Sequence, residues 1–145
     1  MSICCFFGHR NAPDSIKPLL EKEIEHLIIN GLADSFYVGN QGNFDMLVYS
    51  CLKKLSKKYS NIRFKVLLAY PSYSDIYEMS DIYYPKRLKN VSKKSAIPIR
   101  NNIMIEKSDI VICFVERNTG GAARYVRAAE MRGLKIINLA YRSLI

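Results

Sequence analysis

The chain has 145 residues, of which 49% are hydrophobic, and its formal net charge is +9. This length supports one substantial core but not two, so we expect a single domain covering residues 1–145. No apolar run approaches the ~20 residues of a membrane-spanning helix. Because the apolar start is typical of a strand and not of a signal peptide, we expect a cytoplasmic protein.

Predicted strands and helices alternate along the chain. Apolar runs predict strands at residues 2–7, 35–38, 63–70, 109–116 and 135–140. Helical patterns follow them at residues 14–30, 43–59 and 122–132, and Arg100 and Asn101 open a further short helix. This alternation is typical of a Rossmann-like three-layer α/β fold with a mainly parallel sheet. Ligands bind such sheets at the carboxyl ends of the strands.

Residues 71–98 form the irregular part of the chain, rich in Tyr, Ser and Lys. We predict a loop with short helical turns above the crevice, which makes this segment a candidate lid. Its basic and aromatic residues are Tyr83, Tyr84, Lys86, Arg87, Lys89, Lys93 and Lys94. They suit an anionic ligand or single-stranded nucleic acid, and a solvated loop explains them equally well. A second basic group ends the helix 43–59 and is expected to face water: Lys53, Lys54, Lys57 and Lys58.

Cysteine and histidine usage argues against disulfides and metal sites. Cys4, Cys5, Cys51 and Cys113 all lie in apolar runs without Cys-x-x-Cys spacing, which predicts buried, reduced thiols. The chain has only two histidines, and His26 lies on the polar side of its helix. We therefore expect neither a metal ion nor a cofactor.

Polar and glycine residues gather where the predicted strands end and the helices begin. Glycines at such turns let a ligand approach the backbone, and the free N–H groups of a helix start favour phosphate. A tight turn without a ligand would explain any one of these turns alone, but the arrangement repeats. The predicted ligand-binding residues are Gly8, His9, Arg10, Gly39, Asn40, Gly42, Asp45, Arg100, Asn101, Glu116, Thr119, Gly120, Gly121 and Ala122.

Structural roles compete with ligand binding at several of these positions. Arg10 is expected on a phosphate with His9 bonded to the ligand, and an ion pair that braces the loop is the alternative. Asp45 either binds a ribose or caps its helix. Asn101 either orients Arg100 or pairs with a base. Arg100 itself, as a crevice residue, should contribute little to the core.

The order of these motifs carries a resemblance to a known family. Gly8-His9-Arg10, Gly39 with Phe44-Asp45, Arg100-Asn101 with Met104 before Ser108-Asp109, and Gly120-Gly121 occur in sequence along nearly the whole chain. The chain resembles the SLOG superfamily, which joins the LOG nucleotide phosphoribohydrolases and DNA-processing protein A. Its small bacterial and phage members, whose first strand ends in Thr-Gly-His-Arg, are the most similar. The resemblance implies a nucleotide-binding domain and a homodimer.

The resemblance also implies where catalytic residues would lie. Arg100 stands where LOG enzymes have their catalytic arginine, and Gly120-Gly121 stand at the start of their phosphate-binding loop. The third glycine, the threonine and the catalytic glutamate of that loop correspond to Ala123, Arg124 and Arg127. A guanidinium cannot activate water or stabilise a positive oxocarbenium centre as a carboxylate does.

We therefore expect binding of a phosphate-bearing nucleotide or an NAD-derived molecule, sensed or sequestered, in preference to catalysis. Arg127 as an extra phosphate contact favours a ligand with two phosphates, such as one of cyclic ADP-ribose-like shape. The alternative is a nucleoside 5'-monophosphate phosphoribohydrolase that uses Arg100, Glu116 and Glu130. A second alternative is single-stranded DNA binding, in the manner of DNA-processing protein A.

Overall fold

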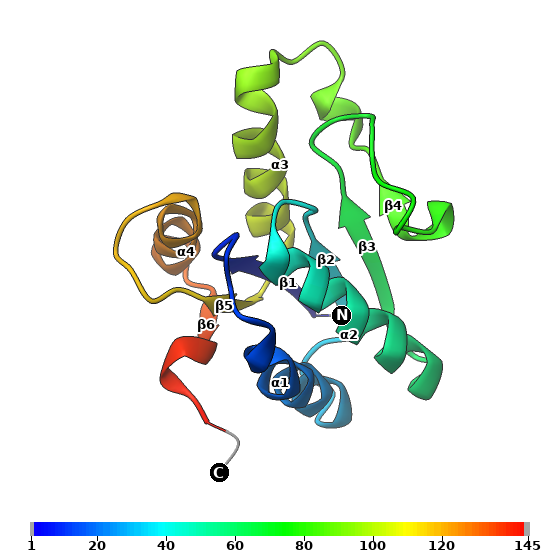
Figure 1. Cartoon of the computed structure of the whole chain (residues 1–145), viewed down its shortest axis with the longest axis vertical. Helices are drawn as coiled ribbons and strands as arrows, with labels where there is room; N and C mark the ends of the chain where they lie inside the picture. Colours follow the sequence, from blue (N-terminus) through cyan, green and yellow to red (C-terminus); the bar gives the residue numbers. More distant parts are fainter. Residues whose placement is uncertain (1, 144–145) are drawn as a thin grey trace.

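Six parallel strands form the central sheet of the computed structural model, which describes residues 2–143 (Figure 1). The strands are β1 (Ile3–Gly8), β2 (Ser35–Val38), β3 (Arg63–Leu67), β4 (Ile82–Tyr83), β5 (Ile110–Phe114) and β6 (Lys135–Asn138). The Rossmann-like α/β prediction is confirmed. The sequence misses only β4, an edge strand of two residues that is too short to produce a period-2 pattern.

The path of the chain across the sheet reverses beside β1. From β1 the chain proceeds outward through β2, β3 and β4, and then returns to β5 and β6 on the other side of β1. Cys4 pairs with Ile110 and Gly8 pairs with Phe114 in the β1–β5 register. Connections on the two sides of such a reversal cover opposite faces of the sheet, which leaves a crevice at the carboxyl ends of the strands.

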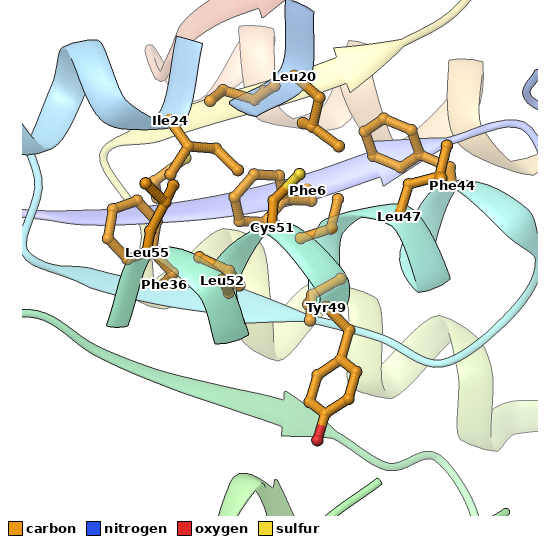
Figure 2. Close-up of a cluster of buried hydrophobic side chains, with 14 of the residues drawn as sticks. Phe6, Leu20, Ile24, Phe36, Phe44, Leu47, Tyr49, Cys51, Leu52 and Leu55 are labelled. Carbon is orange, nitrogen blue, oxygen red and sulfur yellow. The ribbon is translucent and has the colours of Figure 1, made fainter. Parts of the chain in front are cut away.

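Helices cover both faces of the sheet. One layer contains α1 (Lys17–Ile29) and α2 (Asn43–Lys58), and the other contains α3 (Lys93–Lys107) and α4 (Gly121–Met131). Figure 2 shows the first layer, where Phe6 of β1 and Phe36 of β2 pack with Leu20, Ile24, Phe44, Leu47, Cys51, Leu52 and Leu55 of the two helices. Cys5 and Phe7 point into the opposite layer. The strands therefore lack alternation because both of their faces are buried.

The helix α3 begins about two turns before the predicted start at Arg100. It runs from Lys93 and contains Pro98 in its interior. A proline lacks the N–H of the helical ladder and clashes with the preceding turn, so it usually marks a helix boundary. Here the packing of Ala96 against Ala69 and Leu88 accompanies the early start. Residues 93–98 are therefore helix and not a loop.

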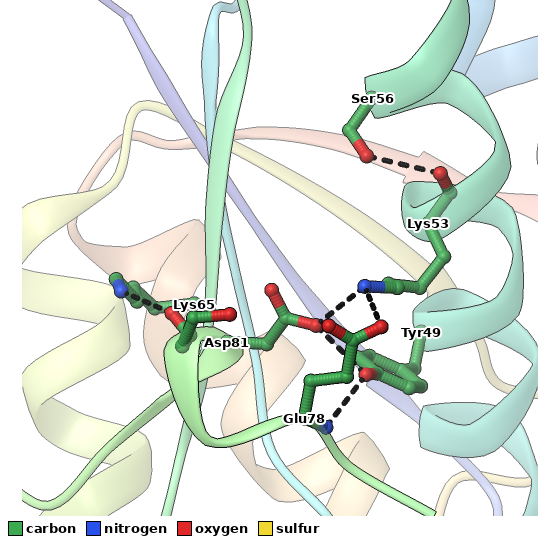
Figure 3. Close-up of polar contacts among 7 residues, drawn as sticks. Tyr49, Lys53, Ser56, Lys65, Glu78 and Asp81 are labelled. Atoms are coloured by element: carbon green, nitrogen blue, oxygen red, sulfur yellow. Dashed lines mark hydrogen bonds and ion pairs between the residues drawn. The ribbon is translucent and has the colours of Figure 1, made fainter.

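The connection between β3 and β4 is attached to the side of α2 (Figure 3). Lys53 pairs with Glu78 at 2.7 Å and with Asp81 at 3.0 Å. The Tyr49 hydroxyl donates to Asp81 at 2.8 Å and accepts the backbone N–H of Glu78 at 3.1 Å. Lys53 is thus paired, although the sequence predicts that it faces water. A lid role for the remaining segment stays a prediction.

The cysteines are free and buried, as the sequence predicts. Burial raises the pKa of Cys5, Cys51 and Cys113 to about 12, so these thiols are protonated at neutral pH. In the part of the chain that the structure describes, no group of three or more His, Cys, Asp or Glu side chains could hold a metal ion. Nor does any helix there combine the length and the apolar character that crossing a membrane requires.

Gly8 provides a test of the packing between β1 and α2. A methyl group at this position would overlap the fully buried ring of Phe44. We expect Gly8→Ala to lower the free energy of unfolding by about 1–3 kcal/mol, measured by urea denaturation. Gly121→Ala is the matched control, because a methyl group there meets nothing within 4 Å. Equal stability of the two variants would contradict the observed packing.

Candidate anion-binding site

A cavity of about 360 Å³ lies at the carboxyl end of β1, where the chain path reverses. Its size falls within the range of ~300–1,000 Å³ that is typical of small-molecule sites. The predicted residues that line it are Gly8, His9, Arg10, Asp45, Arg100, Asn101, Gly120, Gly121 and Ala122. The predicted residues that do not line it are Gly39, Asn40, Gly42, Glu116 and Thr119. The structure thus brings together residues from turns far apart in the sequence.

Several lining residues escaped the sequence analysis: Asn11, Gln41, Ile97, Arg117 and Tyr125. Asn11, Gln41 and Arg117 each lie within a few positions of a predicted site residue, so taking the turns whole would have included them. Tyr125 lies one turn after Gly121 on α4 and stacks on Phe7, with ring centroids 5.7 Å apart. Met104 is buried and also lines the cavity.

Arg100 is a buried structural residue, which corrects the expectation that it contributes little to the core. Only 2% of its surface is exposed. Its Nη1 donates to the Leu67 carbonyl at 2.9 Å, and its Nε donates to Asn101 Oδ1 at 2.8 Å. A side chain at position 39 would collide with the guanidinium of Arg100. The absence of a side chain on Gly39 therefore leaves room for Arg100. Because α3 starts early, Arg100 lies in the helix interior and faces the ends of the strands.

Asp45 holds the loop that precedes α2, and its contact with a ribose stays a prediction. It lies in the first turn of α2, and its carboxylate accepts the backbone N–H of Gln41 at 2.8 Å. The same side chain lines the cavity. Burial raises the pKa of Asp45 to about 6, against the opposing effects of the Gln41 hydrogen bond and of Arg100 and Arg10. Asp45 thus holds the loop before α2 and also presents a carboxyl group to the cavity.

His9 holds the loop between β5 and α4. Its Nε2 accepts the backbone N–H of Glu116 at 2.9 Å, and only 4% of its surface is exposed. The brace that the sequence considered is therefore a hydrogen bond to the backbone and not an ion pair. Burial lowers the pKa of His9, and the charge of Arg117 acts in the same direction. The neutral imidazole is the form that can accept this hydrogen bond.

Two other side chains hold the same loop. Asn138, at the end of β6, accepts the Val115 N–H at 3.1 Å and donates to the Val115 carbonyl at 3.0 Å. Arg127 of α4 donates from Nη1 to the Asn118 carbonyl at 2.8 Å. Arg127 does not line the cavity, and a phosphate contact from this residue stays a prediction. Arg117, two residues after Val115, lines the cavity instead.

Positive charge dominates the walls of the cavity. Arg10, Arg100 and Arg117 line it, with Asp45 as the carboxylate among the described lining residues. Gly120 adopts a φ of 96°, which favours glycine, and precedes the first turn of α4. The N–H groups of that turn and the positive end of the helix dipole favour an anion. Arg10 and Arg117 are exposed, so their guanidinium groups are available to a ligand.

Comparison with known proteins identifies the family of this chain. The model of the YspA SLOG family matches residues 1–138. The chain belongs to this family. Among curated proteins, no significant match is found.

The SLOG fold of this chain also has a match among solved structures. DNA processing protein A from Streptococcus pneumoniae aligns with a TM-score of 0.64 at 15% sequence identity. The alignment covers 95% of this chain and 50% of that protein, so the chain spans half the length of this relative. At such low identity, the similarity shows that the fold is shared.

The carboxylates proposed for hydrolysis in this SLOG chain lie outside the cavity lining. Glu116 and Glu130 are both exposed, and neither lines the cavity. The backbone of Glu116, through its bond to His9, is what connects this residue to the site. The arrangement can therefore bind an anion without placing either glutamate beside it.

We expect Arg100→Ala to destabilise the protein. The change removes a buried side chain and leaves the Leu67 carbonyl and the Asn101 carboxamide without their donor. The expected loss of unfolding free energy is on the order of 3 kcal/mol, measured by urea denaturation. Arg132→Ala, at an exposed position, should stay within about 0.5 kcal/mol of wild type. Wild-type stability of Arg100→Ala would show that the guanidinium is not structural.

The raised pKa of Asp45 predicts a dependence of stability on pH. In the folded protein Asp45 keeps its proton up to about pH 6, whereas the ordinary pKa of an aspartate side chain is 3.8. The contribution to stability is therefore full below pH 3.8 and is lost as the pH rises through about 6. Relative to Asp45→Asn, wild type should lose up to about 3 kcal/mol of unfolding free energy over this window. Parallel stability profiles of the two proteins would refute the shift.

Proposed function

We propose that this SLOG protein binds a phosphate-bearing nucleotide or an NAD-derived small molecule and thereby senses or sequesters it. The supporting observation is the convergence of Arg10, Arg117 and the start of α4 on one cavity. Guanidinium groups and helix N–H groups both donate to phosphate oxygens. Asp45 offers an acceptor for the hydroxyl groups of a ribose, and Tyr125 offers an aromatic surface for contact with a nucleotide base.

The proposal includes a ligand with two phosphates. The residue proposed to contact the second phosphate is Arg117, whereas the sequence suggested Arg127. Arg127 is engaged by the Asn118 carbonyl, whereas Arg117 lies on the cavity wall. Arg10 and Arg117 come from separate loops, after β1 and after β5. Two exposed guanidinium groups from separate loops suit a diphosphate or a cyclic ADP-ribose-like molecule better than a single phosphate.

The alternatives receive less support. Hydrolysis of an N-glycosidic bond by Glu116 or Glu130 would need either carboxylate to reach the cavity, and neither lines it. Single-stranded DNA binding is suggested by the name of the structural relative and by the net charge of +9, but the likeness extends to the fold alone. DNA binding would weaken steeply with salt concentration, which separates it from small-molecule binding. The homodimer stays a prediction.

The proposal is tested by mass spectrometry of small molecules released from the purified protein, followed by calorimetric titration with ADP-ribose and AMP. We expect nucleotide binding that weakens roughly 10- to 100-fold in Arg10→Gln and in Arg117→Gln, since each change removes a charge-assisted hydrogen bond. Arg132→Gln removes the same charge outside the cavity and should bind as wild type does.

Three outcomes would contradict the proposal. Unchanged affinity in both cavity variants would exclude the anion site as the binding site. Absence of any released nucleotide together with no binding of either probe would exclude nucleotide binding. Release of free adenine from AMP, monitored by chromatography, would favour the phosphoribohydrolase instead.

A further inference from the structure

We infer that His9 is a positioning residue, which presents Arg117 to the cavity by holding the Glu116 N–H, and does so only as a neutral imidazole. The effect on ligand affinity rests on the proposed function. The effect on the loop does not, because the hydrogen bond joins two groups of the chain itself.

His9 contacts the loop between β5 and α4 directly. Its Nε2 lies 2.9 Å from the Glu116 nitrogen, and its ring meets Phe114 edge-on, with centroids 6.0 Å apart. The backbone N–H of His9 also donates to the Phe114 carbonyl at 3.3 Å. A nitrogen that accepts an N–H carries no proton, so the proton of the neutral ring lies on Nδ1. The end of β1 is thereby linked to the loop that leaves β5.

The position of the His9 hydrogen bond within the loop determines which part of the loop it holds. Asn138 holds Val115 at the start of the loop, and Arg127 holds Asn118 beyond its middle. His9 holds Glu116 between these two points, directly before Arg117. Loss of the His9 bond would therefore free the backbone that sets the direction of the Arg117 side chain, while Val115 and Asn118 stay attached.

Protonation would break this bond. An imidazolium donates from both nitrogens, so its Nε2–H would face the Glu116 N–H. The charged groups around the ring and across the cavity are Glu116 and Arg117 of the loop, Arg10 beside it, Asp45 of α2 and Arg100 of α3. Burial and Arg117 lower the pKa of His9 from 6.5, so the hydrogen bond to the Glu116 N–H breaks at a pH below 6.5. The neighbouring carboxylate of Glu116 acts against this effect.

Amide hydrogen exchange of residues 116–120 in the ligand-free protein tests the inference between pH 5 and pH 8, after correction for intrinsic rates. His9→Leu removes the acceptor and should exchange roughly two- to tenfold faster, the factor that one net hydrogen bond provides. His9→Gln offers a carboxamide oxygen that does not titrate, so its protection should persist at pH 5. Wild type should match His9→Gln at pH 8 and shift toward His9→Leu as the pH falls below 6.5.

The controls separate this inference from other causes. Asp45→Asn should keep the wild-type dependence on pH, which excludes Asp45 as its source. Loss of protection in His9→Gln equal to that in His9→Leu, or protection in wild type that is independent of pH, would overturn the inference. If His9→Leu does not fold, the comparison of wild type with His9→Gln across pH decides the question alone.

Titration of His9→Leu with ADP-ribose at pH 8 connects the loop to the proposed function. We expect weaker binding than in wild type, with Arg132→Gln as the control of unchanged affinity. If the exchange data follow the expected pattern but neither wild type nor any variant binds ADP-ribose or AMP, the proposed function fails while the positioning role of His9 stands.

Discussion

The reversal of the chain path beside β1 is the constraint on which the cavity depends. Parallel strands all end at the same edge of the sheet, and the connections on the two sides of β1 cover opposite faces. The loops after β1 and β5 are therefore adjacent, with space between them that neither helix layer fills. Arg10 and Arg117, more than a hundred positions apart in sequence, line one cavity for this reason.

The loop after β5 shows how the surrounding elements convert this space into an organised site. Backbone groups that leave a strand lose their ladder partners and need others. Side chains at the ends of β1 and β6 and on α4 supply them, namely His9, Asn138 and Arg127. The loop is thereby held by groups of the chain itself, and such organisation lowers the ordering cost of binding. Packing of the sheet and the position of the cavity-lining loop are thus linked through these three contacts.

Several residues that resemble ligand contacts make room for other side chains. Gly39 allows the guanidinium of Arg100 to approach, Gly42 lies against Arg10, and Gly8 lies under the ring of Phe44. Glycines at strand ends serve close packing as well as ligand approach, and the sequence does not distinguish these uses. This explains why some predicted glycines line the cavity and others support the residues that do.

Apolar periodicity and turn glycines, which are local properties of the chain, predict the strands β1, β2, β3, β5 and β6 and the helices α1, α2 and α4. They also locate the turns that form the cavity. Three features depend on the tertiary structure: the early start of α3, the burial of Arg100, and the position of Arg117, but not Arg127, in the cavity lining. Each of these depends on contacts between residues distant in sequence, such as Arg100 with Leu67 and His9 with Glu116, which local patterns do not record.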